Sequence, residues 1–312
     1  MKERLFNWLG ENIWVFLTGS IFLGILFPKL KIFKPYIAYF LMVVLYVTFL
    51  KVDVNVALSH IKRPLLIIYY VLMNLVISPI ILYFLFFAFT KNYSILSSVL
   101  LLGLVPSGVA ASAMTDVSKG ETPLTVVLTI VSHLVAIFTI PTIFFIVFRK
   151  SMNLNYISIL IDVAKLIGIP LILATLSNMI FKEKINFIKK RAKFFTVISL
   201  VFVISSIMAV NSTYIKETPT KVLIYLSILY VVFIFSQLFS FFTVPSLSVK
   251  EKIAISNAKT FSNIGLGLVI ASKYLSPEAA IILALSQIPW PTMLISLKII
   301  LKLSSKISSS PL

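Results

Sequence analysis

The chain has 312 residues, of which 59% are hydrophobic and only 12% are charged. This composition excludes an ordinary soluble domain and indicates a protein that crosses a membrane several times. A net charge of +18 would suggest nucleic-acid binding in a soluble protein, but here we assign it to loop lysines that face anionic lipid. The chain has no Cys, which excludes disulfides and thiolate metal sites.

Ten apolar stretches follow one another along the chain, and most approach the roughly 20 residues that a transmembrane helix needs. The connections between them are short and leave no room for a soluble domain. The predicted spans are Asn12–Phe27, Pro35–Leu50, Leu65–Phe89, Ile95–Val117, Leu124–Phe148, Tyr156–Phe181, Phe194–Val210, Val222–Val244, Ile253–Tyr274 and Ala279–Leu301. The sequence therefore predicts an all-α polytopic membrane protein.

The distribution of Lys and Arg predicts the orientation of this protein. With ten spans both termini lie on one side of the membrane, and most of the loop cations fall on that side. A cluster from Lys182 to Lys193 contributes most to this difference. We therefore expect a multi-pass protein of the plasma membrane with both termini in the cytoplasm.

An internal repeat relates the two halves of the chain. The segments "VSKGETP" (Val117–Pro123) and "ASKYLSP" (Ala271–Pro277) share the pattern Ser-Lys-x-x-[Thr/Ser]-Pro and lie about half the chain apart. Each precedes a helix that we expect to begin at the Pro, which is a favourable first position. Five helices per half is an odd number, so the halves must insert with opposite orientations. We predict two inverted repeats, residues 1–150 and 151–312, in one membrane domain.

The fourth and ninth predicted helices are both interrupted. The first interruption, Leu104–Ser112, contains Pro106 and Gly108, which remove a helical hydrogen bond and loosen the backbone. The second, Ser256–Gly265, combines small and polar residues. One such break could be an ordinary kink between packed helices. Two breaks at matching positions favour crossed broken helices that bind ions and substrate near the middle of the bilayer.

Three stretches of the chain resemble the bile acid:sodium symporter family. Lys62–Pro79 resembles its third helix, Pro106–Pro141 its fourth and fifth, and Ile253–Ile282 its ninth and tenth. The resemblance implies ten helices, in which a panel (helices one, two, six and seven) faces a core that holds the crossed helices. It also implies sodium-coupled uptake of organic anions, from bile acids to small carboxylates.

The resemblance further implies a set of sodium ligands. Thr125 and Thr129 stand where the family has hydroxyl ligands. Asn74 stands where a Gln is usual, Ser112 replaces an Asn, and Asn263 keeps the family's Asn. All five positions therefore retain a side-chain oxygen.

Four other positions depart from the family pattern. Ser262 replaces a Gln, and Ala111 replaces a Ser and supplies no ligand. Ala258 occupies the position of a Glu that serves both sodium ions, and Lys259 follows it. The resemblance therefore implies at most one weak sodium site. Lys259 either stands in for the missing cation, carries a proton, or lines a wet crevice without a role.

Four more titratable side chains lie in or near predicted spans: Asp116, His133, Asp162 and Lys165. Asp116 could pair with Lys259, with Lys119 or with no residue, and we favour Lys119. Asp116 and His133 are also candidates for a proton relay. His133 could equally be a packed hydrogen-bonding residue. Asp162 and Lys165 lie three residues apart on one helix and are expected to neutralise each other.

The sequence contains no catalytic constellation, so we expect a carrier and not an enzyme. The two His residues fall on separate elements, and no metal site beyond the weak sodium site is expected. The predicted pocket face presents a polar and net positive set that suits a carboxylate: Ser107, Ser112, Lys259, Ser262 and Asn263.

The leading hypothesis is thus a secondary active transporter of small organic anions, coupled to sodium or protons and without a resident cofactor. The alternatives are an auxin-carrier-like permease, a proton-coupled carrier, and a membrane receptor that does not transport. We expect the protein to contact its substrate and the lipid bilayer but no nucleic acid, and to be a monomer or weak oligomer.

Overall fold

The computed structural model describes residues 13–51, 63–108, 110–149, 155–244 and 246–309. The regular elements in these ranges are all helices, and they occupy each of the ten predicted spans. Six of the described helices are long and apolar enough to cross a membrane, or seven if one bent pair counts as a single span. Both chain ends and the predicted boundary between the halves, at residues 150 and 151, lie outside the described residues.

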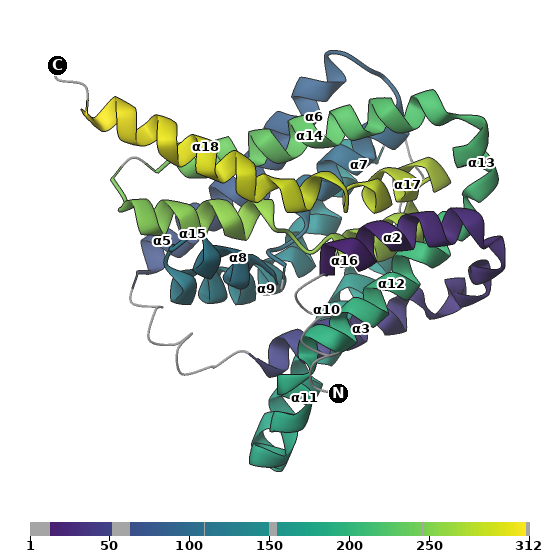
Figure 1. Ribbon diagram of the computed structural model, residues 1–312, viewed down its shortest axis with the longest axis horizontal. Helices are drawn as coiled ribbons and strands as arrows, with labels where there is room; N and C mark the ends of the chain where they lie inside the picture. Colours follow the sequence, from purple (N-terminus) through teal and green to yellow (C-terminus); the bar gives the residue numbers. More distant parts are fainter. Residues whose placement is uncertain (1–12, 52–62, 109, 150–154, 245, 310–312) are drawn as a thin grey trace.

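One group of helices, which we call the panel, packs around α12 (Figure 1). Helix α12 lies against α2 and α3, and α10 lies against α3. A 3₁₀ segment, η1, leads directly into α3, and η3 and α11 join α10 to α12. The bounds are α2 Ile13–Leu26, η1 Pro28–Tyr36, α3 Ile37–Leu50, α10 Tyr156–Phe181, η3 Lys182–Ile185, α11 Asn186–Lys190 and α12 Ala192–Val210.

The remaining helices form the core, and α13 (Ser212–Glu217) connects the panel to it. Helix α14 packs against α15 and α18, while α9 packs against α8 and α15. The bounds are α5 Pro64–Tyr70, the π-helical η2 Val71–Ile77, α6 Ser78–Phe87, α7 Tyr93–Leu104, α8 Ala110–Val117, α9 Thr122–Phe148, α14 Pro219–Phe242, α15 Val249–Thr260, α16 Ile264–Tyr274, α17 Pro277–Leu285 and α18 Pro289–Ser309.

Local sequence explains where several core helices begin. Pro123 and Pro277 stand in the first turns of α9 and α17, as the repeated segments predict. Helix α15 begins with a capping box, in which the Ser248 hydroxyl accepts from the Glu251 N–H while the Glu251 carboxylate accepts from the Ser248 N–H.

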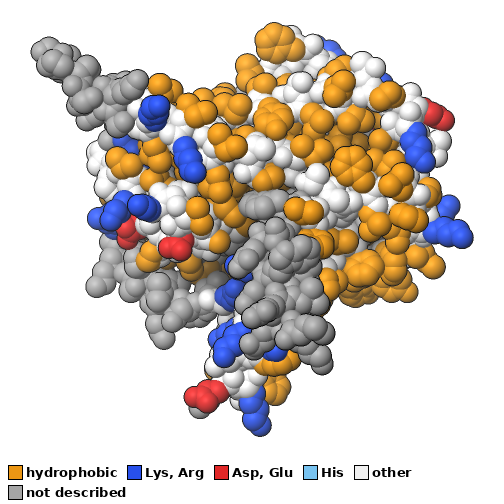
Figure 2. Space-filling view, in the orientation of Figure 1, with side chains coloured by type: hydrophobic (Ala, Val, Ile, Leu, Met, Phe, Trp, Pro, Cys, Tyr) orange, Lys and Arg blue, Asp and Glu red, His pale blue; other side chains and the backbone are white. Residues whose placement is uncertain are grey.

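The lateral surface of the bundle is apolar. Phe84, Phe138, Ile146, Leu223 and Ile295 are each more than 60% exposed. Figure 2 shows a broad hydrophobic face with Lys and Arg gathered towards its margins. Such a surface would be unfavourable in water but matches hydrocarbon tails bounded by polar headgroups. The chain is therefore a multi-pass membrane protein.

Two helices differ from their predicted form. The second interruption is shorter than expected, because α15 continues through Thr260 and only Phe261–Asn263 leave the helix. The tenth span is not a continuous helix, since α17 and α18 meet at a bend of 47°. Pro289 and Pro291 follow this bend, and neither can donate the backbone hydrogen bond of a continuing helix.

Close packing of α2 on α12 depends on Gly24. A Cβ atom at this position would lie 2.7 Å from the Met208 Cβ and would also contact the Ser205 backbone. In Gly24→Ala the two helices must move apart, and we expect a loss of about 1–3 kcal/mol in stability. Gly19→Ala is the matched control in the same helix, because nothing lies within 4 Å of its added Cβ. Thermal unfolding of the detergent-solubilised variants measures the difference, and equal midpoints would contradict this packing.

Candidate functional site

The two interrupted helices meet inside the core. The first consists of α7 and α8, separated by residues 105–109, and the second consists of α15 and α16, separated by residues 261–263. Ser107 and Ser262, one from each break, form an isolated antiparallel β-bridge. Both side chains are almost fully buried. The non-helical backbone of one break therefore pairs with that of the other.

Two short hydrogen bonds hold this crossing together. The Gly108 N–H donates to the Phe261 carbonyl at 2.7 Å, and the Asn263 N–H donates to the Pro106 carbonyl at 2.7 Å. Within a bilayer, each unpaired backbone group costs several kcal/mol. These two bonds avoid part of that cost, because each break accepts a hydrogen bond from the other. Four helix ends converge here: the C-terminal ends of α7 and α15 and the N-terminal ends of α8 and α16.

The break after α7 frees the carbonyl of Gly103. In a continuing helix this carbonyl would accept from the N–H of Ser107. Pro106 ends the helix, and the Ser107 N–H instead donates to the Ser132 hydroxyl of α9 at 3.1 Å. The Gly103 oxygen is thus left without its helical donor.

A π-helical turn frees a second carbonyl, that of Asn74. The Ser78 N–H donates to Met73, five residues back, and so passes over Asn74. The next residue, Pro79, has no N–H to donate. The backbone oxygen of Asn74 is therefore also available to a donor from outside its own helix.

Lys259 binds both freed carbonyls. Its Nζ donates to Gly103 O at 2.5 Å and to Asn74 O, and only 4% of the residue is exposed. In the described part of the chain, the ion pairs are Arg63–Glu251 and Lys273–Asp162, so no carboxylate pairs with this ammonium. Backbone dipoles, including the negative end of α7, compensate the charge.

His133 connects α9 to the second break. Its Nδ1 contacts the Thr129 carbonyl at 2.7 Å, and its Nε2 contacts the Asn263 side-chain nitrogen at 3.1 Å. The Asn263 oxygen accepts from the Leu266 N–H, so the amide nitrogen is the donor to the ring. These contacts assign a neutral imidazole with its proton on Nδ1. The ring of Phe49, from the panel, packs edge-on against His133 at 5.3 Å between centroids.

Hydroxyl groups of α9 complete the polar centre. The Thr129 hydroxyl lies 2.9 Å from that of Ser107 and donates to the Thr125 carbonyl at 2.8 Å. The Thr125 hydroxyl donates to Thr115 of α8 at 3.0 Å and lies 3.4 Å from the Ala254 carbonyl of α15. Hydrogen bonds among these groups thus join the first break, α8, α9 and α15.

The site departs from the sequence expectations at several positions. Ala258 is fully buried in an apolar cluster with Tyr70 and Leu128, so an alanine methyl stands where the resemblance implies a carboxylate. Ser112 is half-buried on α8. Asp116 is exposed, joins neither hydrogen bond of His133, and forms no ion pair with Lys119.

A cavity of about 50 Å³ separates the crossing from the panel. Its core side mixes polar and apolar residues, and its panel side is mainly apolar. The core contributes Gly108, Ala110, Ser262, Asn263, Ile264, Gly265, Gln287 and Trp290, and the panel contributes Leu17, Val44, Thr196 and Leu200. The cavity is far smaller than the ~300–1,000 Å³ of ligand pockets, so an organic anion fits only if the panel and the core separate.

Sequence reasoning missed three members of this centre. Ser132 accepts the N–H freed at Ser107, and its position three residues after Thr129 on one helix face was an available signal. Thr115 bonds Thr125 across two helices, which no local pattern reveals. The Gly103 carbonyl could have been anticipated, because it lies three residues before a helix-ending proline.

Interrupted helices that cross inside an apolar helical bundle are the architecture of secondary transporters. Residues 38–218, more than half of the chain, match the family model described as the Sodium Bile acid symporter family. The chain belongs to this family. It is also 22% identical over 282 residues to "Uncharacterized sodium-dependent transporter YocS" of Bacillus subtilis (strain 168), covering 89% of this chain and 87% of that protein. The family match includes the first break and ends before the second.

The crossing requires a glycine at position 108. An added Cβ would lie 2.7 Å from the Phe261 oxygen and 2.8 Å from the Ser262 oxygen, and neither backbone group can rotate away. We expect Gly108→Ala to break the crossing and to lower stability by about 1–3 kcal/mol or more. Gly168→Ala is the control, since nothing lies within 4 Å of its added Cβ. Thermal unfolding in detergent compares them, and an unaffected Gly108→Ala would refute the requirement for glycine.

Proposed function

We propose that this protein is a secondary transporter that carries a small organic anion across the membrane and binds it at the crossing of the two interrupted helices. The observation that supports this most directly is the buried ammonium of Lys259, held by two carbonyls within about one helical turn of the crossing. A buried cation that has no carboxylate partner inside a bilayer is costly and is typical of a transport site.

The surroundings of the crossing favour an anion with an apolar body. The N-terminal ends of α8 and α16 carry partial positive charge, and both begin at the crossing. Lys259, two residues before the second break, adds a full positive charge within the core. The opposite wall is formed by panel side chains such as Leu17, Val44 and Leu200. A carboxylate would face the crossing while the rest of the molecule lies against the panel.

The transport cycle follows from this arrangement. In our proposal the chain forms ten spans as two inverted repeats, residues 1–150 and 151–312, with both termini in the cytoplasm of a plasma-membrane protein. The described helices support it, since each half contributes one interrupted helix to the crossing. Because the cavity is closed to a substrate of ordinary size, the panel moves relative to the core to expose the site to alternate sides.

The coupling ion is the second part of the proposal. The family and the sodium-dependent relative favour sodium, and Thr125, Thr129 and Ser112 supply oxygens for one weak site. However, Ala258 provides no carboxylate, and the Lys259 ammonium occupies carbonyls that a cation would use. Lys259 therefore acts as a built-in cation, and uptake depends only weakly on sodium.

A proton is the second candidate as coupling ion. The buried His133 supports it, because its ring links Thr129 to Asn263 at the crossing. In that version uptake changes with pH, whereas a fixed cation on Lys259 gives a flat pH profile.

The test of this function is substrate uptake by Lys259→Met. This change keeps the length of the side chain and removes its charge. In sealed proteoliposomes, with radiolabelled cholate and pyruvate as probes of large and small carboxylates, we expect uptake to fall at least about tenfold, the equivalent of 1.4 kcal/mol. Lys165→Met is the matched control, because Lys165 is exposed on the panel.

The variant also leaves two buried carbonyls unpaired, so its thermal unfolding must be measured alongside. Uptake by a folded Lys259→Met at the wild-type rate, at every pH and sodium concentration, would show that Lys259 has no role in transport. The absence of accumulation of any probe by the wild type would favour a receptor without transport.

The proposed exchange of sodium for lysine can be reversed. In Ala258→Glu with Lys259→Ala, a carboxylate returns and the two carbonyls lose their ammonium, so a sodium ion gains both charge and ligands. We expect uptake by the double variant to rise severalfold with sodium while the wild type changes little. Measuring initial rates against sodium, with choline as the replacement, tests this. A steep sodium dependence of the wild type would instead show an intact sodium site.

A further inference from the structure

One carboxylate joins the panel to the core at the end of α16. Asp162, on α10 of the panel, accepts from the Lys273 ammonium and from the Tyr274 hydroxyl, and both donors belong to α16 of the core. The Tyr274 hydroxyl also lies 3.0 Å from the Ser158 carbonyl of α10. The hydrogen-bonded cation of Asp162 is thus Lys273, from another helix, and the predicted partner Lys165 acts on this carboxylate only through its charge.

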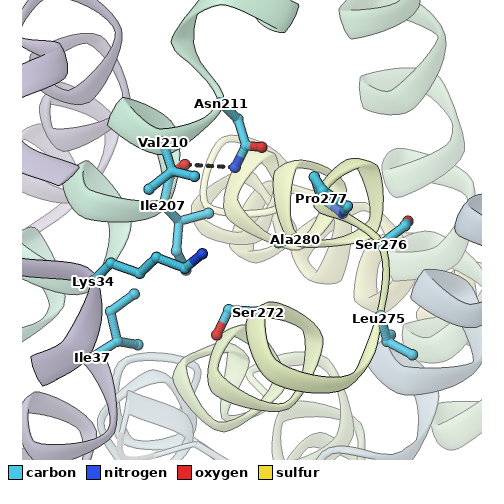
Figure 3. A pocket seen from close by; sticks show the side chains of 10 residues that line it. All are labelled: Lys34, Ile37, Ile207, Val210, Asn211, Ser272, Leu275, Ser276, Pro277 and Ala280. Carbon is cyan, nitrogen blue, oxygen red and sulfur yellow. Dashed lines mark hydrogen bonds between the residues drawn. The ribbon is translucent and has the colours of Figure 1, made fainter. Parts of the chain in front are cut away.

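A seam between the panel and the core runs beside this contact (Figure 3). It encloses about 70 Å³. Figure 3 shows the Lys34 side chain reaching into the seam from the panel, towards Ser272 of the core. The panel lines it with Lys34, Ile37, Ile207 and Val210, and the core lines it with Ser272, Leu275, Ser276, Pro277 and Ala280; Asn211 closes one end.

The seam and the Asp162 contact share the last turn of α16. Ser272 and Leu275 face the seam, while Lys273 and Tyr274, between them in sequence, bind α10. Helix α10 packs on α3, which supplies Ile37 to the seam. Opening the seam must therefore separate α16 from the panel, and that movement breaks the bonds of Asp162.

We propose that the seam is the outer entrance for the organic anion, and that Asp162 keeps this entrance closed by binding Lys273 and Tyr274. The inference rests on the proposed transport function for its substrate and on the proposed topology for its side. Lys34 gives the entrance a cation that attracts a carboxylate. The ion pair is partly exposed, so it stabilises the closed entrance only weakly. A weak contact is what an entrance that opens in each transport cycle requires.

Cysteine labelling tests the proposal directly, because the chain contains no Cys. Ala280→Cys places a thiol on the seam, where only 3% of the native residue is exposed. Intact cells receive a membrane-impermeant thiol reagent, and the labelling rate is compared in otherwise wild-type and Asp162→Ala backgrounds. We expect about a fivefold faster rate in Asp162→Ala, the size expected for the loss of one partly exposed ion pair.

Three further variants separate the role of Asp162 from general loosening. Tyr274→Phe removes one of the two donors and should give a smaller increase, about twofold. The exchange Asp162→Lys with Lys273→Asp should restore slow labelling. Glu251→Ala breaks the Arg63–Glu251 pair, which lies within the core, and should leave the rate unchanged.

Several results would overturn the proposal. They are an unchanged rate in Asp162→Ala, labelling only after the cells are permeabilised, no labelling in any background, or an equal increase in Glu251→Ala. The assay needs no substrate, so it fails independently of the transport proposal. If the wild type takes up a probe but Asp162→Ala labels at the wild-type rate, only the role of Asp162 is rejected. If labelling changes as expected but the wild type takes up no probe, only the proposed transport function is rejected.

Discussion

Backbone groups that leave a helix inside a bilayer have no water to bind, and this constraint governs the centre of the molecule. Each break exposes N–H and C=O groups, and the structure satisfies them in three ways. The two breaks pair with each other through Gly108 and Asn263. A side-chain hydroxyl, that of Ser132, accepts one freed N–H. The ammonium of Lys259 donates to two freed carbonyls, so the proposed binding centre also satisfies the freed backbone groups.

Placing an ammonium at this point changes what the centre can bind. Carbonyls at the C-terminal end of a helix suit a cation, and a lysine supplies one that never dissociates. The polar groups that remain at the crossing include the N-terminal ends of two helices, which suit an anion. In our proposal, a centre that would bind a free cation together with an anion thus becomes a centre in which the Lys259 ammonium, part of the chain itself, is the cation. Such an arrangement ties the binding energy of the anion less closely to the sodium gradient.

The sequence predicted the features that depend on local rules. Pro106 and Gly108 marked the first break, and Pro123 and Pro277 marked the starts of new helices. It misjudged the second break, because Ser256–Thr260 contain no proline and remain helical once packed against α14. One partner of Lys259, the Asn74 carbonyl, could not be predicted from the sequence, since only a π-helical turn frees it. Asp162 was assigned to Lys165 by spacing, whereas tertiary packing brings it Lys273.

The edge-on contact between Phe49 and His133 has a further consequence. Phe49 belongs to the panel and His133 to the core, so any displacement of one body against the other changes the position of the phenyl ring relative to the imidazole. Aromatic rings shift the resonance frequencies of nearby protons through their ring currents. The imidazole protons of His133 are therefore a built-in spectroscopic marker, beside the crossing of the two breaks, of whether the two bodies are together or apart.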